Sequence, residues 1–125
     1  MASILIVDDS PTETYKMEVA LKKHGFEVFK ADNGMDGVAA AKKHLPDLVL
    51  MDVVMPGLNG FQATRQLTQA KETAHIPVII VTTKDQQTDK LWGKRQGAKG
   101  YLVKPVDEKK LVDSVRQVME GAILF

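Results

Sequence analysis

Three carboxylates follow two apolar segments of the chain. Asp8 and Asp9 come directly after residues 4–7, Ile-Leu-Ile-Val, and Asp52 comes directly after residues 48–51, Leu-Val-Leu-Met. Such runs are typical of strands that are buried on both faces of a parallel sheet, where functional groups collect outside the carboxyl ends of the strands. Three like charges in one site repel each other unless a cation is bound, and hard oxygen ligands suit Mg²⁺. The sequence therefore predicts a magnesium site formed by Asp8, Asp9 and Asp52.

Two further polar residues follow apolar segments in the same way. Thr82 follows residues 78–81, Val-Ile-Ile-Val, and Lys104 follows residues 101–103, Tyr-Leu-Val. A hydroxyl group and an ammonium group would then lie at the same edge of the sheet as the three carboxylates. Together these groups predict a site for magnesium-assisted phosphoryl chemistry.

Strand and helix patterns alternate along the whole chain. The expected strands are residues 4–7, 27–31, 48–51, 78–81 and 101–103. The expected helices run from Pro11 to about Gly25, from after Asn33-Gly34 to before Pro46, from the cap Asn59 onward, from about 86 to 96, and from the cap Asp107 onward. Five βα units with short links predict one α/β domain over residues 1–125, built as a three-layer sandwich with helices on both faces of a parallel sheet.

Bulk properties narrow the classes of protein that remain. The net charge of +1 gives no electrostatic reason to expect nucleic acid or membrane partners, and the absence of cysteine excludes disulfides and thiolate metal sites. The first residues lack the pattern of a signal peptide, and no apolar stretch approaches the ~20 residues of a membrane span. We therefore expect a cytoplasmic domain, and we expect it to be a monomer.

The motifs occur in an order and at spacings that are together highly specific. They are Ile6-Val7-Asp8-Asp9-Ser10, Met51-Asp52, Met55-Pro56-Gly57, Val81-Thr82, Gly97-Ala98 and Lys104-Pro105. The chain resembles the receiver domains of bacterial two-component response regulators over nearly its whole length. Residues 9–13, 56–67 and 92–98 resemble more closely the single-domain regulators of chemotaxis-like systems that control type IV pili and twitching motility.

The resemblance implies a fold and a reaction. The fold would be flavodoxin-like with strand order 2-1-3-4-5. Asp52 would accept a phosphoryl group from a CheA-like histidine kinase or from its phosphotransfer domain. Asp9, Asp52 and the backbone carbonyl of Val54 would bind Mg²⁺ directly, and Asp8 would act through a bound water. The chain would be a signalling protein that catalyses its own phosphorylation and slow dephosphorylation rather than an enzyme with a separate substrate.

The resemblance also assigns roles to residues of the last two strands. Lys104, before a cis Pro105, would face the phosphate, and Thr82 would donate a hydrogen bond to a phosphoryl oxygen. Thr83 competes for that role because a shift of one residue reverses the face of a strand. Tyr101 would turn inward when the threonine moves toward the phosphate. A downstream protein would bind the face formed by the helix at 86–96, the strand at 101–103 and the helix after Asp107.

Structural interpretations of the same residues remain open at this point. Asp8 and Asp9 also suit the N-terminus of the following helix, and a solvated Asp52 or Lys104 is common. The basic side chains around residues 84–99 are as consistent with a solvated surface as with the binding of an acidic partner. We expect Trp92 to pack in the core, and residues 122–125 to extend the last helix or to fray.

Two other classes of protein share parts of this pattern. An aspartate-nucleophile, magnesium-dependent phosphatase of the haloacid dehalogenase type would need an aspartate at position 54, which here is valine. A flavodoxin would need a phosphate-binding loop after the first strand, and Asp8 and Asp9 would repel a phosphate there.

Overall fold

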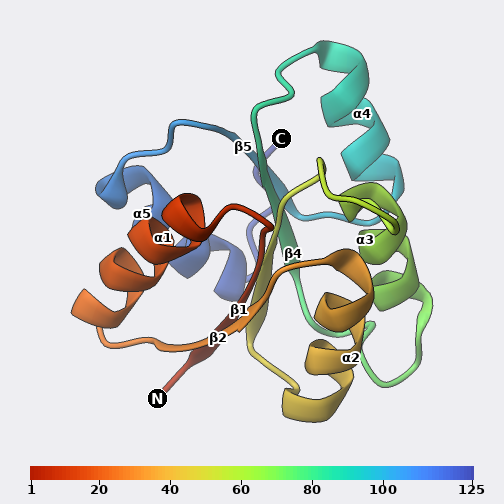
Figure 1. The fold of residues 1–125 in the computed structure, drawn as a ribbon. Helices are drawn as coiled ribbons and strands as arrows, with labels where there is room; N and C mark the ends of the chain where they lie inside the picture. The colour runs from red at the N-terminus through yellow and green to blue at the C-terminus, as the bar shows by residue number, and fades with distance from the viewer.

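The computed structural model describes residues 1–125 and confirms the alternation of strands and helices (Figure 1). The strands are β1 (Ser3–Val7), β2 (Glu27–Ala31), β3 (Leu48–Met51), β4 (Val78–Thr82) and β5 (Gly100–Val103). The helices are α1 (Pro11–Lys23), α2 (Gly34–His44), α3 (Gly60–Gln69), α4 (Gln87–Arg95) and α5 (Glu108–Met119).

All five strands are parallel and lie in the order β2-β1-β3-β4-β5. Figure 1 shows α1 and α5 on one face of this sheet and α2, α3 and α4 on the other. Both faces are therefore covered, which explains the uninterrupted apolar runs at residues 4–7 of β1, 48–51 of β3 and 78–81 of β4. The predicted flavodoxin-like three-layer fold is confirmed.

Polar side chains set the starts of the helices largely as the sequence indicates. The hydroxyl of Ser10 accepts a hydrogen bond from the backbone N–H of Glu13, and Pro11 is the first helical residue of α1. Asn59 and Gln62 form a reciprocal capping box at the start of α3, and Asp107 caps α5. The longest helix, α1, has 13 residues, and none of the helices is long and apolar enough to cross a bilayer.

The prediction that Trp92 packs in the core is wrong. Its side chain is 49% exposed, whereas its neighbour Gly93 is buried against Ile80 and Tyr101. An added Cβ at Gly93 would lie 2.8 Å from a methyl carbon of Ile80. The short helix α4 approaches the sheet closely through its glycine, and this orientation turns the larger tryptophan outward.

Residues 122–125 neither extend α5 nor fray. Leu124 forms a parallel β-bridge with Gly100, and its N–H donates a 2.7 Å hydrogen bond to the carbonyl of Lys99. The chain thus returns to the sheet and runs beside the free edge of β5. The prediction missed this outcome because four apolar residues at a chain end carry no clear helical or strand period.

Candidate functional site

Strand register brings the predicted site residues to one edge of the sheet. Val7 of β1 is paired with Met51 of β3, so Asp8 and Asp52, the next residue of each strand, leave the sheet side by side. Thr82 is paired with Val103, and the backbone N–H of Lys104 donates a 2.8 Å hydrogen bond to the carbonyl of Thr82. Four consecutive strands of the sheet therefore end around a single site.

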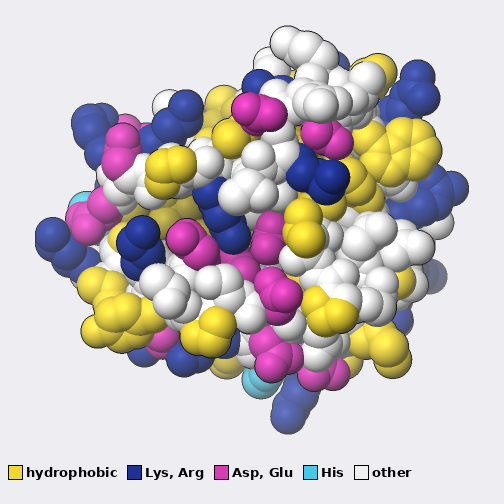
Figure 2. All heavy atoms as spheres, turned by 45° about the horizontal axis from the view of Figure 1, so that its top comes forward, with side chains coloured by type: hydrophobic (Ala, Val, Ile, Leu, Met, Phe, Trp, Pro, Cys, Tyr) yellow, Lys and Arg dark blue, Asp and Glu magenta, His cyan; other side chains and the backbone are white.

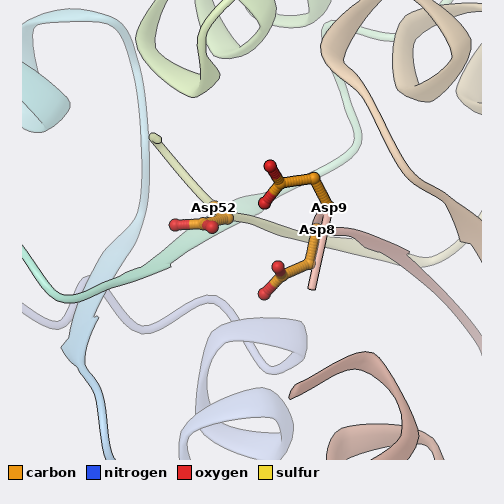
Figure 3. Close-up of side chains that lie close together, drawn as sticks. All are labelled: Asp8, Asp9 and Asp52. Carbon is orange, nitrogen blue, oxygen red and sulfur yellow. The ribbon is translucent and has the colours of Figure 1, made fainter. Parts of the chain in front are cut away.

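The three acidic side chains lie close together, as the sequence predicted. One carboxylate oxygen from each of Asp8, Asp9 and Asp52 lies within 4.8 Å of the other two. Figure 3 shows that Asp8 and Asp9 come from the end of β1 and Asp52 from the end of β3. Asp8 and Asp52 are buried, whereas Asp9 is exposed. Figure 2 shows acidic side chains gathered in the middle of this face of the molecule, with basic side chains among them.

Asp52 is buried within this acidic group. One of its carboxylate oxygens accepts a 2.8 Å hydrogen bond from the backbone N–H of Val53. Burial raises the pKa of the Asp52 carboxyl above its usual range, and the nearby charge of Asp8 raises it further. The charge of Lys104 and the contacts with Val53 and Thr82 oppose this rise without cancelling it.

Lys104 is the positive charge of the site. Its ammonium nitrogen lies 2.7 Å from Asp8 and 3.5 Å from Asp52, and its side chain is only 10% exposed. Burial alone would lower the pKa of Lys104, but the hydrogen bond to Asp8 and the charges of Asp52 and Asp8 raise it above its usual value. The ammonium therefore stays protonated and points into the site, so the interpretation as a solvated lysine is wrong. The peptide bond between Lys104 and Pro105 is cis, as predicted.

The remaining predicted residues occupy different positions around the site. Thr82 is completely buried at the end of β4, whereas its competitor Thr83 is exposed, which favours Thr82. Val54 lies in the loop after β3 with its side chain 55% exposed, and the role of its carbonyl as a metal ligand stays a prediction.

Tyr101 is buried, and its hydroxyl donates a 2.9 Å hydrogen bond to the carbonyl of Lys84. Burial, followed by the charges of Asp89, Asp85 and Asp52, raises the pKa of Tyr101 to about 12.

The donor set fits a hard divalent cation. Three carboxylates contribute oxygen ligands within a small volume, and a single lysine does not neutralise all three. The exposure of Asp9 leaves the group open to solvent, which suits Mg²⁺ because this ion keeps several waters. Asp8, Asp9 and Asp52 are therefore the residues that would hold the ion.

Sequence reasoning missed the role of Gly60 in shaping this site. The backbone N–H of Gly60 donates a 3.0 Å hydrogen bond to the carbonyl of Val53, and a Cβ at this position would collide with the carbonyl oxygen of Asp52. The first turn of α3 thus packs directly on the backbone that carries Asp52. The signal was present in the sequence as a glycine immediately after the cap Asn59.

The basic residues around α4 lie mainly on the surface. Lys84, Lys94, Arg95 and Lys99 are exposed and Lys90 is partly exposed, so this region offers a positively charged surface near Tyr101. Whether it binds a downstream partner stays a prediction.

Comparisons with known proteins agree with this geometry. A family model described as the response regulator receiver domain matches residues 4–116. Protein PilH of Pseudomonas aeruginosa is 68% identical over 121 residues, which cover 97% of this chain and 100% of PilH. Response regulator PleD of Caulobacter vibrioides is 38% identical over 117 residues, but this chain covers only 26% of it.

Solved structures show the same fold. Chemotaxis protein CheY4 of Vibrio cholerae matches with a TM-score of 0.90 and 32% identity, covering 94% of this chain and 98% of that one. The receiver domain of a histidine kinase from Syntrophus aciditrophicus matches with a TM-score of 0.89 and 30% identity, covering 97% and 92%. These similarities favour neither the phosphatase nor the flavodoxin alternative. The chain belongs to the response regulator receiver family.

Proposed function

We propose that this chain is a stand-alone phosphoacceptor of a two-component phosphorelay, with Asp52 as the residue that is phosphorylated. The observation that supports this most directly is the place of Asp52, which is buried beside Asp8 and 3.5 Å from the ammonium nitrogen of Lys104. A carboxylate in this position can attack a phosphorus atom while a fixed positive charge lies beside it.

The reaction takes the phosphoryl group from a phosphohistidine. A carboxylate oxygen of Asp52 attacks phosphorus, a P–O bond forms, and the P–N bond to the histidine breaks. Its electron pair returns to the imidazole ring of the donor, which leaves as neutral imidazole when its second nitrogen is protonated and otherwise takes up a proton from water. Only the ionised carboxylate has this reactivity, and the charge of Lys104 favours that form against the effect of burial.

Two groups offset the negative charge that arrives with the phosphoryl oxygens. Lys104 supplies an ammonium group that already lies between Asp8 and Asp52. Mg²⁺ bound by Asp8, Asp9 and Asp52 would supply further positive charge at the same place. The hydroxyl of Thr82, which contacts the carboxyl of Asp52 from the end of β4, is a donor for one phosphoryl oxygen.

The phosphorylated form would act through a change at Thr82 and Tyr101, or it would serve as a phosphate sink for another regulator. In the first case the face of α4, β5 and α5 would bind a downstream protein. The high identity to PilH supports a place in a chemotaxis-like system that controls type IV pili and twitching motility. The phosphoryl donor would then be a CheA-like histidine kinase or its phosphotransfer domain.

Incubation with acetyl phosphate and Mg²⁺ tests the acceptor. Intact-protein mass spectrometry should show the addition of one phosphoryl group to the wild type and none to Asp52→Asn. Asp113→Asn is a matched control, because Asp113 is a surface carboxylate on α5 that pairs with Lys109. Labelling of Asp52→Asn, or loss of labelling in both variants, would refute the assignment of Asp52.

The phosphoryl donor is tested by incubation with purified histidine kinases of the source organism that carry a radiolabelled phosphoryl group. We expect the fastest transfer from a kinase or phosphotransfer domain of chemotaxis type. Fastest transfer from a kinase of another type would contradict the place in a pilus system, but it would leave Asp52 as the acceptor.

A further inference from the structure

The segment Gly121–Phe125 is fixed to the fold by its backbone. Gly121 has a φ of +103°, a left-handed conformation that suits glycine, and it reverses the chain at the end of α5. The N–H groups of Gly121 and Ala122 donate hydrogen bonds to the carbonyls of Val118 and Gln117. This pattern is a Schellman motif, which ends the helix and directs the following residues back toward the sheet.

Leu124 attaches the segment to the edge of β5. Its N–H donates a 2.7 Å hydrogen bond to the carbonyl of Lys99, and it forms a parallel bridge with Gly100, one residue before Tyr101. Its partly buried side chain packs against the core cluster that contains Leu102 and Val115. The family model ends its match at residue 116, so the attachment lies outside the part of the chain that the model describes.

Phe125 then lies against Tyr101. The centroids of the two rings are 6.4 Å apart and the ring planes are tilted by 53°, which is a favourable aromatic geometry. Tyr101 is 9% exposed, whereas Phe125 is 48% exposed. Tyr101 therefore has three restraints: the hydrogen bond to Lys84, the close approach of Gly93, and the ring of Phe125.

We propose that the segment Gly121–Phe125 is a positioning element for Tyr101, in which Leu124 fixes the segment to β5 and Phe125 favours the buried orientation of the tyrosine ring. The role of that orientation in signalling rests on the proposed function, in which Tyr101 turns inward on phosphorylation. A contact made in one of two states shifts the population toward that state. Because phosphorylation would favour the same inward orientation of Tyr101, the segment in turn favours phosphorylation of Asp52.

The positional part is tested by NMR with ¹³C-labelled tyrosine. The chain has two tyrosines, Tyr101 and the exposed Tyr15, so each spectrum contains two sets of ring signals. In Phe125→Ala the Tyr101 signal should shift toward that of an exposed tyrosine. Ile123→Ala is the matched control, because Ile123 lies in the same segment and is 61% exposed. An unchanged Tyr101 signal in Phe125→Ala, or equal changes in both variants, would overturn the proposal.

The attachment by Leu124 is tested by amide hydrogen exchange. The Leu124 N–H should be protected in the wild type and in Ile123→Ala, because it is bonded to Lys99. Exchange at the rate of an unstructured peptide in the wild type would overturn the proposal.

The signalling part is tested by the phosphorylated fraction at a fixed acetyl phosphate concentration in the presence of Mg²⁺. Loss of a single aromatic contact should lower the ratio of phosphorylated to free protein by about threefold in Phe125→Ala and leave it unchanged in Ile123→Ala. A shifted Tyr101 signal with an unchanged ratio would refute the link to phosphorylation. If the wild type accepts no phosphoryl group, the proposed function and this link both fail, while the NMR result still decides whether Phe125 positions Tyr101.

Discussion

The ammonium nitrogen of Lys104 lies 2.7 Å from a carboxylate oxygen of Asp8, although the two residues are 96 positions apart in the sequence. The side chain of Lys104 is 10% exposed and that of Asp8 is 1% exposed. The second carboxylate oxygen of Asp8 accepts a 2.9 Å hydrogen bond from the backbone N–H of Ser10. This ion pair joins the end of β5 to the end of β1 across the site, so Lys104 contributes to folding as well as to any reaction at Asp52.

In the absence of divalent cations, replacement of Lys104 by methionine should destabilise the protein. The change leaves Asp8 buried without its charged partner, which should lower the free energy of unfolding by roughly 3 kcal/mol. Urea unfolding in the presence of EDTA measures the loss. Lys109→Met is the matched control, because Lys109 has an even shorter contact with Asp113 but is exposed, and its loss should change stability little. Equal losses in the two variants would show that burial does not control the strength of the Lys104 pair.

The Asp9→Asn variant should bind Mg²⁺ more weakly and be more stable without the ion. Two unit charges ~4 Å apart interact by about 4 kcal/mol at an effective dielectric constant of 20, so removal of one charge relieves a substantial repulsion. Calorimetric titration with Mg²⁺ should show a loss of affinity of at least ~10-fold, equivalent to about 1.4 kcal/mol. Asp32→Asn, which removes another exposed carboxylate, should retain the affinity. If Asp9→Asn binds Mg²⁺ as tightly as the wild type, the metal site is elsewhere.

The sequence was sufficient to predict which polar side chains lie together at this edge of the sheet. Each of Asp8, Asp52, Thr82 and Lys104 follows or ends an apolar run, and parallel strands that are covered on both faces must align their ends. The pairing of Lys104 with Asp8 was not predictable in the same way. Which carboxylate a lysine contacts depends on side-chain directions and depth, and these follow from packing rather than from spacing.

The errors have a common physical origin. Trp92 was expected in the core, but the close contact between α4 and β5 needs the small residue Gly93. The segment 122–125 was expected to extend a helix or to fray, but Gly121 ends α5 and returns the chain to the sheet edge. In both cases a glycine decides the geometry, and hydrophobicity alone does not reveal its effect.

Tyr101 should make the protein less stable as the pH rises from about 10 to about 12. The pKa of Tyr101 is about 12 in the folded protein, compared with 10.0 for a tyrosine in the unfolded chain. In this range the unfolded chain releases the phenol proton while the folded protein keeps it, so the free energy of unfolding falls with rising pH. The slope from this one group approaches about 1.4 kcal/mol per pH unit.

Urea unfolding of the wild type and of Tyr101→Phe at several pH values measures this contribution. Below pH ~9 the wild type should be more stable by about 1 kcal/mol, because it keeps the hydrogen bond to Lys84. This advantage should shrink and then reverse as the pH approaches ~12. Tyr15→Phe serves as the control, since Tyr15 is exposed. A constant difference between wild type and Tyr101→Phe over the whole range would contradict the raised pKa.

The lifetime of an aspartyl phosphate at position 52 should depend on Val54 if the proposed function is correct. Hydrolysis requires a water in line with the P–O bond that breaks, and Val54, two residues after Asp52, is 55% exposed. Valine offers no hydrogen bond to orient such a water, and Lys84, two residues after Thr82, can donate but cannot accept while it is charged. The Val54→Asn variant should therefore lose its phosphoryl group faster, by up to ~10-fold, which requires a barrier lower by about 1.4 kcal/mol.

Phosphate release after removal of acetyl phosphate measures the rate. Val54→Ala is the control that separates the hydrogen bond from the loss of bulk: it should be slower than Val54→Asn if the amide positions the water. Decay of Val54→Asn at the wild-type rate or below would show that residue 54 does not control the water.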